Sequence, residues 1–246
     1  MKLIVIGHGM VGHKFLETLF ADADLASSFD VTVLCEEPRP AYDRVHLSSF
    51  FSGTTAEQLS LVAPGFLEQH AAHITLKLNA HATAVDRSAK TVTLAGGEVL
   101  GYDKLVFATG SSPFVPPVPG RERDDCFVYR TIEDLEAMLA CGSRARSGVV
   151  VGGGLLGLEC AKALRDMGLA THVVEFAPRL MAVQVDDLGG RMLRAKIEEL
   201  GVSVHTQKST LRIVDGEAAT HRMELADGSS LEADMIVFSA GIRARD

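Results

Sequence analysis

The sequence predicts an α/β protein in which one three-layer domain, built from a sheet, helices and an inserted β-hairpin or meander, occurs twice. Three repeated features predict this fold class. A short apolar strand runs into a glycine-rich turn at residues 2–12 and again at 148–157. Each turn opens a helical pattern, and a second strand that ends in an acid follows each helix. Each half then closes with a hairpin and a buried strand that ends in glycine, at 94–110 and 225–241.

The two closing segments carry the clearest part of the repeat. Aligned without gaps, "LAGGEVLGYDKLVFATG" and "LADGSSLEADMIVFSAG" agree at eight of seventeen positions, including Phe107 and Phe238. Between the halves, "SSPFVPPVPG" holds four of the chain's eight prolines, and its stiff, extended character suits a connection between domains. We therefore expect a first domain over residues 1–113 and a second domain over 114–246.

Composition and charge exclude several classes of partner. The 246 residues are 47% hydrophobic and 23% charged, an ordinary globular mix that allows one large or two ordinary domains. The net charge is −8 and there is no run of Lys and Arg, so nucleic acid is not an expected partner. No stretch approaches the roughly 20 apolar residues of a membrane span, and the first apolar run is too short for a signal peptide. We expect a cytoplasmic protein with no membrane partner.

Both glycine-rich turns match the GxGxxG pattern of dinucleotide-binding folds. The first glycine permits a tight turn, the second lets the backbone approach a pyrophosphate, the third lets helix and strand pack closely, and the helix N-terminus attracts the anion. An acid follows in each half: Glu36 lies 24 residues after Gly12, and Glu175 lies 18 residues after Gly157. This context predicts two Rossmann-like dinucleotide-binding domains rather than two turns without a ligand. The turn glycines are Gly7, Gly9 and Gly12, then Gly152, Gly154 and Gly157.

Two dinucleotide sites in one chain suggest two different dinucleotides. FAD in one site and NAD(P)H in the other describe an enzyme that passes a hydride to a flavin. Glu175 can accept hydrogen bonds from ribose hydroxyls and would repel a 2′-phosphate, so NADH is favoured over NADPH. Arg179, four residues further on, either softens that preference or is a solvated loop arginine.

The cysteines and histidines form no recognisable reactive or metal-binding pattern. The four cysteines include no CxxC pair, so no iron–sulfur, zinc or dithiol site is expected, and Cys35 reads as a packing residue. His8 and His13 flank the first turn without a carboxylate or cysteine neighbour that would complete a metal site. His46 either lies near a flavin or is a partly exposed structural histidine.

The order of strand, GxGxxG, acid, hairpin, "ATG" and second GxGxxG resembles the glutathione-reductase-like flavoproteins with two dinucleotide-binding domains, over the whole chain. Within that class, "GHGMVGHKF" and "EEPRPAYDRVHLSSFF" are similar to the N-terminal flavin module of the large subunits of NAD(P)H-dependent assimilatory nitrite reductases. The second stretch is also similar to ferredoxin and rubredoxin reductases, although Ser49 stands where several ferredoxin reductases have Lys. The segment 42–52 lacks the cysteines of the disulfide reductases, so thiol redox chemistry is not expected.

The resemblance implies an FAD site in the first domain and an NAD(P)H site in the second. The first acid would bind the adenosine ribose of FAD, Arg44 would lie near its pyrophosphate or flavin, and the backbone of Ala82 would contact adenine. Glu159 would face the nicotinamide end. The residues implied for FAD are Gly7, Gly9, Val11, Gly12, Glu36, Arg44, Ala82, Thr109 and Gly110. Those implied for NADH are Gly152, Gly154, Leu155, Leu156, Gly157, Glu159, Glu175 and Gly241; no metal ligand is implied.

The resemblance also implies a function and its wider setting. The chain would pass hydride from NADH to FAD and electrons onward, as part of an enzyme that reduces nitrite to ammonia through iron–sulfur domains, sirohaem and a [4Fe–4S] cluster carried elsewhere. The alternatives are an NADH:ferredoxin or rubredoxin-type reductase that serves a small electron carrier, and a nucleotide-binding remnant without turnover. In this class a last strand and helix return to complete the FAD domain after a position like Gly241. We expect that domain to be incomplete at its C-terminus here, and FAD binding to be weakened.

Overall fold

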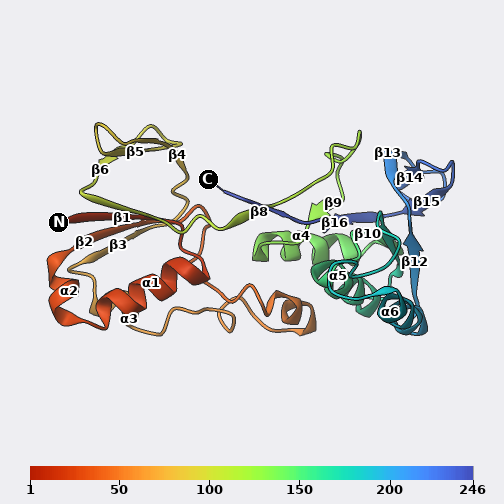
Figure 1. Cartoon of the computed structure of the whole chain (residues 1–246), viewed down its shortest axis with the longest axis horizontal. Helices are drawn as coiled ribbons and strands as arrows, with labels where there is room; N and C mark the ends of the chain where they lie inside the picture. Colours follow the sequence, from red (N-terminus) through yellow and green to blue (C-terminus); the bar gives the residue numbers. More distant parts are fainter. Residues whose placement is uncertain (246) are drawn as a thin grey trace. The chain divides into compact units, whose positions relative to one another are not determined.

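The computed structural model describes residues 1–245, which form two compact units (Figure 1). Each unit contains a parallel sheet, helices and an antiparallel meander, so the predicted α/β class is confirmed. Residues 1–46, 54–111 and the segment from 244 onward form the first unit, and residues 47–53 and 112–243 form the second.

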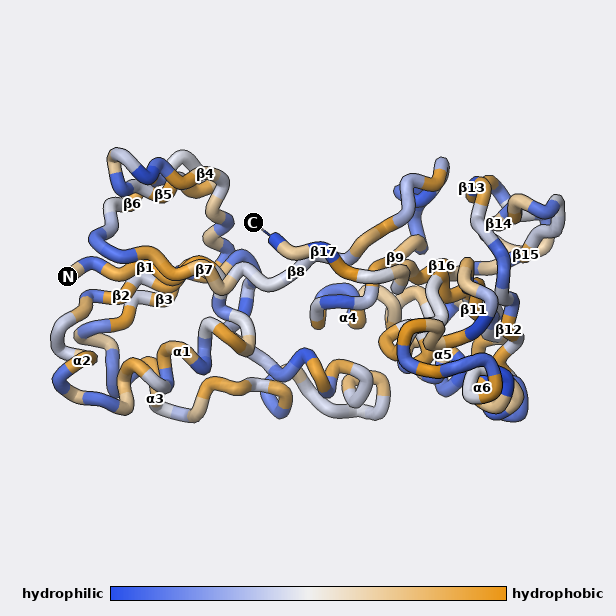
Figure 2. The backbone as a smooth tube through the Cα atoms, viewed as in Figure 1, coloured by the Kyte–Doolittle hydropathy of each residue, from blue (hydrophilic) through white to orange (hydrophobic). Residues whose placement is uncertain are grey.

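The first unit is built on a four-stranded parallel sheet with the order β3-β2-β1-β7. Both faces of the central strand β1 are apolar: Leu3 and Val5 pack on the helix side, whereas Ile4 and Ile6 pack on the meander side. Figure 2 shows this apolar character along β1 and β7. The strands are β1 (Lys2–Ile6), β2 (Asp30–Leu34), β3 (Ile74–Lys77) and β7 (Lys104–Phe107).

Helices cover one face of this sheet and the meander covers the other (Figure 1). Leu16 and Phe20 of α1 lie on one helical stripe and are buried against β1, while Val92 and Leu94 of the meander cover the opposite face. The helices are α1 (Met10–Phe20), α2 (Ala23–Ser28) and α3 (Phe66–Gln69). The meander consists of β4 (Ala82–Asp86), β5 (Thr91–Leu94) and β6 (Val99–Gly101).

The second unit repeats this plan around a five-stranded parallel sheet with the order β12-β11-β10-β16-β9. Ile213 and Met223 of its meander are buried against Val149 and Ile236 of the sheet. The strands are β9 (Cys126–Val128), β10 (Ser147–Val151), β11 (Ala170–Glu175), β12 (Val202–Thr206) and β16 (Met235–Phe238), and the meander is β13 (Thr210–Asp215), β14 (His221–Leu225) and β15 (Ser230–Ala233). The helices are η1 (Leu47–Ser52), α4 (Ile132–Gly142), α5 (Leu155–Asp166) and α6 (Asp187–Glu199).

Identical residues of the sequence repeat make equivalent bonds in the two units. Asp103 accepts a hydrogen bond from the N–H of Lys2 at 2.7 Å, and Asp234 accepts one from the N–H of Ser147 at 3.2 Å. Each aspartate therefore ties the start of the closing strand to the start of the first strand of its sheet. Both meanders also carry a register irregularity at the same place, in the first residues of β4 and of β13.

The two closing strands differ in burial. All four residues of β16 are buried because the strand lies between β10 and β9, and Phe238 is only 2% exposed. In contrast, β7 is an edge strand of its sheet, and Phe107 is 59% exposed. The prediction of two buried closing strands is therefore right for β16 and wrong for β7, which has a sheet neighbour on one side only among the described residues.

A short pairing of β8 (Ser111–Pro113) with β17 (Ile242–Ala244) lies where the chain passes between the residue sets of the two units. Its strands are held by a backbone hydrogen bond from Phe114 to Gly241 and by the Arg243 guanidinium over the Phe114 ring, 4.4 Å from its centroid. Within residues 1–245, every helix is too short or too polar to cross a membrane.

Candidate functional site

The first glycine loop, residues 7–12, uses its three glycines for different physical reasons. Gly7 has φ +106°, and a Cβ there would lie 2.2 Å from the carbonyl oxygen of Ala108. A Cβ on Gly12 would lie 2.2 Å from the carbonyl oxygen of Gly7. Gly9 differs from both: its φ is −95°, and a Cβ there would meet no atom within 4 Å. Neither backbone conformation nor packing within the chain explains the glycine at position 9.

The second glycine loop, residues 152–157, repeats this arrangement. A Cβ on Gly152, which has φ +122°, would lie 2.2 Å from the carbonyl oxygen of Ser239, and one on Gly157 would lie 2.0 Å from that of Gly152. Gly154 has φ −80° and faces open space. The small residues that follow the closing strands are thus explained, because Ala108 and Ser239 lie directly against the glycine turns. The open space at the second glycine of each loop fits the close approach of a ligand backbone such as a pyrophosphate.

The helices that follow the two loops have uncapped N-termini. Gly9 and Gly154 are the N-cap residues of α1 and α5; neither supplies a side-chain hydrogen bond, and no acid stands in either first turn. The side chains of Asp22, Thr131 and Asp186 cap α2, α4 and α6 instead. The free N–H groups and the helix dipole leave two anion-binding positions, one in each unit. Side chains at the predicted contact positions beside them are exposed: Val11 72%, Leu155 58% and Leu156 40%.

Glu175 ends β11 and is held by backbone amides of its own unit. One carboxylate oxygen accepts a hydrogen bond from the N–H of Gly153 at 2.5 Å, and the other accepts one from the N–H of Ala177 at 2.6 Å. Each carboxylate oxygen can accept a further bond, so the group is oriented yet able to receive ribose hydroxyls. Arg179 is committed to the following loop, where its guanidinium donates to the carbonyl of Val185 at 2.9 Å and pairs with Asp187 at 2.8 Å.

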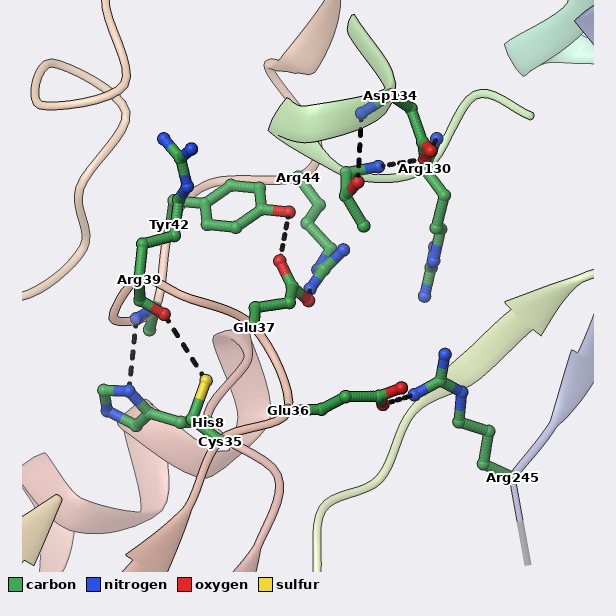
Figure 3. A network of polar contacts seen from close by, with 12 residues as sticks. His8, Cys35, Glu36, Glu37, Arg39, Tyr42, Arg44, Arg130, Asp134 and Arg245 are labelled. Carbon is green, nitrogen blue, oxygen red and sulfur yellow. Dashed lines mark hydrogen bonds and ion pairs between the residues drawn. The ribbon is translucent and has the colours of Figure 1, made fainter. Parts of the chain in front are cut away.

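Two adjacent acids follow β2 and face different partners (Figure 3). Glu37 accepts a hydrogen bond from the Tyr42 hydroxyl at 2.7 Å and pairs with Arg44, whose guanidinium lies over the Tyr42 ring at 4.7 Å from the centroid. Glu36 points the other way, toward Arg245, and its second oxygen lies 3.3 Å from Nδ1 of His81. Of the two predicted FAD residues in this stretch, Glu36 is therefore the half-exposed acid, and Arg44 is bound to the neighbouring acid.

The segment that carries these acids is fastened to the first glycine loop by His8. The N–H of Ala41 donates to Nδ1 of His8 at 3.2 Å, and the Cys35 thiol donates to the carbonyl of Arg39 at 3.4 Å (Figure 3). His8 is 5% exposed, and burial together with the nearby His13 ring lowers its pKa to about 4. His8 is therefore neutral at pH 7, and its role in the described structure is to hold the loop rather than to add charge.

The remaining predicted FAD positions lie on two elements. Thr109 and Gly110 follow β7 and meet the first glycine loop through Ala108; the Thr109 hydroxyl donates to the carbonyl of Arg245 at 2.6 Å. Ala82 begins β4 and packs beside the apolar cluster under the meander rather than on the loop itself. In the second unit, Gly241 has φ +124° and joins β16 to β17.

Glu159 lies on α5 and lines a separate hollow of about 190 Å³ in the second unit. The opposite wall is the 3₁₀ helix η1, which contributes Ser48, Ser49 and Phe51. Burial raises the pKa of nearby Tyr129, whose ring stacks on Phe51 at 6.2 Å. Sequence reasoning assigned Glu159 to the nicotinamide end but did not foresee that residues 47–53 join the second unit.

The thiols are held in the protonated form. Burial raises the pKa of all four cysteines, to about 11 for Cys126 and about 12 for Cys141, so thiolate is scarce at neutral pH. All four are free thiols. Among residues 1–245, His, Cys, Asp and Glu side chains form no group of three or more that could hold a metal ion.

Comparison with known proteins shows the family to which the chain belongs. The family model described as pyridine nucleotide-disulphide oxidoreductase matches residues 1–246, and the chain belongs to this family. Its sequence is 56% identical to the nitrite reductase (NADH) large subunit of Escherichia coli strain K12 over 100% of this chain and 29% of that protein. It is 35% identical to the nitrite reductase [NAD(P)H] of Bacillus subtilis strain 168 over 98% of this chain and 30% of that protein. The predicted resemblance is confirmed, and the chain spans less than a third of the length of these two relatives.

Solved structures share the fold over nearly the whole chain. A ferredoxin reductase from Rhodopseudomonas palustris superposes with a TM-score of 0.88 at 26% identity, over 98% of this chain and 59% of that one. A water-forming NADH oxidase from Lactobacillus brevis, bound to NADH, superposes with a TM-score of 0.89 at 22% identity, over 99% of this chain and 54% of that one. The predicted pair of Rossmann-like halves agrees with these neighbours.

Proposed function

We propose that the chain is a flavin-dependent NADH oxidoreductase module of an assimilatory nitrite reductase, in which the first unit binds FAD and the second binds NADH. The observation that carries the proposal is the repeated second glycine. Gly9 and Gly154 face open space at uncapped helix N-termini, whereas their flanking glycines are explained by packing. Bound FAD would supply a group that accepts a hydride and releases electrons onward.

The residues of each unit would bind and orient one dinucleotide. In the first unit the loop amides would hold the FAD pyrophosphate, Glu36 the adenosine ribose, Ala82 the adenine edge, and Thr109 and Gly110 the flavin side. Arg44, anchored by Glu37, is a candidate near the pyrophosphate or flavin. In the second unit the amides after Gly154 would hold the NADH pyrophosphate, with Glu159 as the candidate at the nicotinamide end. The further proposed contacts are Gly7, Val11 and Gly12 for FAD, and Gly152, Leu155, Leu156, Gly157, Glu175 and Gly241 for NADH.

Several features of the second unit support NADH over NADPH. The Glu175 carboxylate would lie beside a 2′-phosphate and repel it, and the backbone amides of Gly153 and Ala177 hold the carboxylate there. Arg179 is the nearest arginine along the chain, and its bonds to Val185 and Asp187 draw it into the loop. The cost of placing a phosphate beside Glu175 is therefore not offset by that arginine.

The relatives support a proposal for the onward acceptor. Nitrite reductase large subunits of Escherichia coli, Klebsiella oxytoca and Bacillus subtilis are 56%, 55% and 35% identical to the chain. We infer that electrons pass to iron–sulfur and sirohaem centres in other parts of the whole protein, where nitrite would become ammonia. The likeness to a ferredoxin reductase at 26% identity favours a small iron–sulfur protein as the alternative acceptor.

The proposal is tested by anaerobic addition of NADH to the FAD-loaded chain. We expect bleaching of the flavin absorbance and, on addition of ferricyanide, repeated turnover. NADPH should react at least about tenfold less efficiently. Bound FAD that NADH leaves oxidised would contradict the proposed reaction, and equal reaction with NADPH would contradict the coenzyme preference.

A further inference from the structure

Arg245 makes three contacts that join two segments of the first unit. Its N–H donates to the carbonyl of Gly110 at 3.0 Å, its carbonyl accepts from the Thr109 hydroxyl at 2.6 Å, and its guanidinium pairs with Glu36. Figure 3 shows the Glu36 and Arg245 side chains pointing toward one another. Both the main chain and the side chain of Arg245 are therefore held by polar contacts, which fixes the direction of its guanidinium.

These anchors lie on opposite sides of the first glycine loop. Glu36 follows β2, while Thr109 and Gly110 follow β7, and β1 lies between those strands in the sheet. Neighbouring strands are about 4.8 Å apart, so the link from β7 to β2 covers about 10 Å. Arg245 therefore reaches across the carboxyl end of β1, where the loop that begins at Gly7 opens.

The charges around Glu36 indicate the role of its ion pair with Arg245. The adjacent acid Glu37 already holds Arg44 and the Tyr42 hydroxyl, so Arg44 is engaged away from Glu36. Glu36 itself contacts two basic side chains, those of Arg245 and His81. An acid that is 45% exposed has several accessible rotamers, and a pair of partners on its two oxygens restricts them.

We propose that Arg245 is a positioning residue of the FAD site: it holds the Glu36 carboxylate in the orientation that receives the adenosine ribose hydroxyls. This inference rests on the proposed FAD site in the first unit. It adds a contribution from a segment 209 residues away in sequence to a site otherwise built from the first 110 residues. Each carboxylate oxygen retains one acceptor position beside its present partner, so ribose and Arg245 can be bound together.

The test compares Arg245→Gln, Glu36→Gln and the double variant by quenching of flavin fluorescence on FAD binding, with ADP as a competing probe. We expect Arg245→Gln to weaken FAD about threefold to tenfold, and ADP by the same factor, since ADP keeps the ribose and pyrophosphate. The double variant should bind no more weakly than Glu36→Gln alone, because the arginine acts through the glutamate. Arg245→Lys should recover part of the loss.

Two controls separate positioning from general damage. Arg212→Gln removes an equivalent charge from an exposed ion pair with Glu224 in the second unit and should leave FAD binding unchanged. NADH binding should be the same in all variants. Unchanged or tighter FAD binding by Arg245→Gln overturns the inference, as does a fully additive double variant. A wild-type chain that binds NADH but neither FAD nor ADP overturns the FAD assignment itself, and this inference with it.

Discussion

The two units present the same kind of acid at the same point of the same fold, yet they hold it differently. Glu175 is oriented by the backbone amides of Gly153 and Ala177, both within two dozen residues along the chain. Glu36 is oriented by the side chains of Arg245 and His81. The second acid is therefore held by its own loop, and no cationic side chain within residues 1–245 pairs with it. The first depends on a distant segment and is charge-compensated.

A second contrast concerns the closing strands. Phe107 and Phe238 occupy equivalent positions of the repeat, but Phe238 is buried between neighbouring strands whereas Phe107 is mostly exposed on an edge. Equivalent residues in a repeat thus need not carry equivalent shares of the stability. Experiments on such matched positions show how far the two units differ.

The largest effect is expected from truncating the two phenylalanines. Phe238→Ala should lower the free energy of unfolding by about 3–5 kcal/mol, because it opens a cavity in the core of the second unit. Phe107→Ala should lower it by less than about 1 kcal/mol, because the ring is already largely in water. Urea denaturation of both variants measures the difference. Equal losses would mean that β7 is covered as fully as β16.

Within the first unit, acid sensitivity should be greatest at His8. Its pKa is lowered from 6.5 to about 4 by burial and by the His13 ring, so the unfolded chain binds the proton first as pH falls. Stability should therefore fall with decreasing pH between about 6.5 and 4, by up to about 3 kcal/mol. His8→Asn, which keeps an acceptor for the N–H of Ala41, should flatten that part of the profile.

The control for this prediction is His46→Asn, because His46 is 71% exposed and pairs with Asp43 on the surface. It should leave the difference between pH 6.5 and pH 4 nearly unchanged. If His8→Asn keeps the full wild-type slope, the slope comes from the histidines of the second unit, His172, His205 and His221, whose pKa values are also lowered by burial.

The smallest effect concerns coenzyme preference in the second unit. Glu175→Gln should raise the affinity for NADPH relative to NADH by about tenfold, since it removes the charge that opposes a 2′-phosphate. The ratio of dissociation constants, measured by nucleotide fluorescence, reports this directly. Glu224→Gln, which removes a charge on β14 that pairs with Arg212, should not move the ratio. An unchanged ratio in Glu175→Gln would place the discrimination elsewhere.

Much of the fold could be predicted because its signals are local. The glycine turns, the acids that end β2 and β11 and the aligned closing segments are each encoded within a few residues, and the structure places them as paired features of two sheets. The role of Ala108 and Ser239 as small residues under the turns also follows once the strands are in register.

What could not be predicted is set by contacts between residues far apart in sequence. The sequence Glu36-Glu37 does not say which acid binds Arg44. That choice depends on the fold of residues 37–44, which places the Arg44 guanidinium over the Tyr42 ring and beside Glu37. The pairing of Arg245 with Glu36 spans 209 residues. The membership of residues 47–53 in the second unit likewise has no local signal. The exposure of strand β7 and the place of residues 47–53 both ran against direct expectations.

The central claim is that the two loops bind two different dinucleotides, and Gly9→Ala and Gly154→Ala test it most directly. Both positions have negative φ and open space, so neither variant should lose more than about 1 kcal/mol of stability. We predict from titrations that Gly9→Ala will lower the affinity for FAD at least about tenfold and leave the affinity for NADH unchanged. Gly154→Ala should lower the affinity for NADH by a similar factor and leave that for FAD unchanged. Loss of the same nucleotide in both variants, or of neither nucleotide in either, would contradict the account.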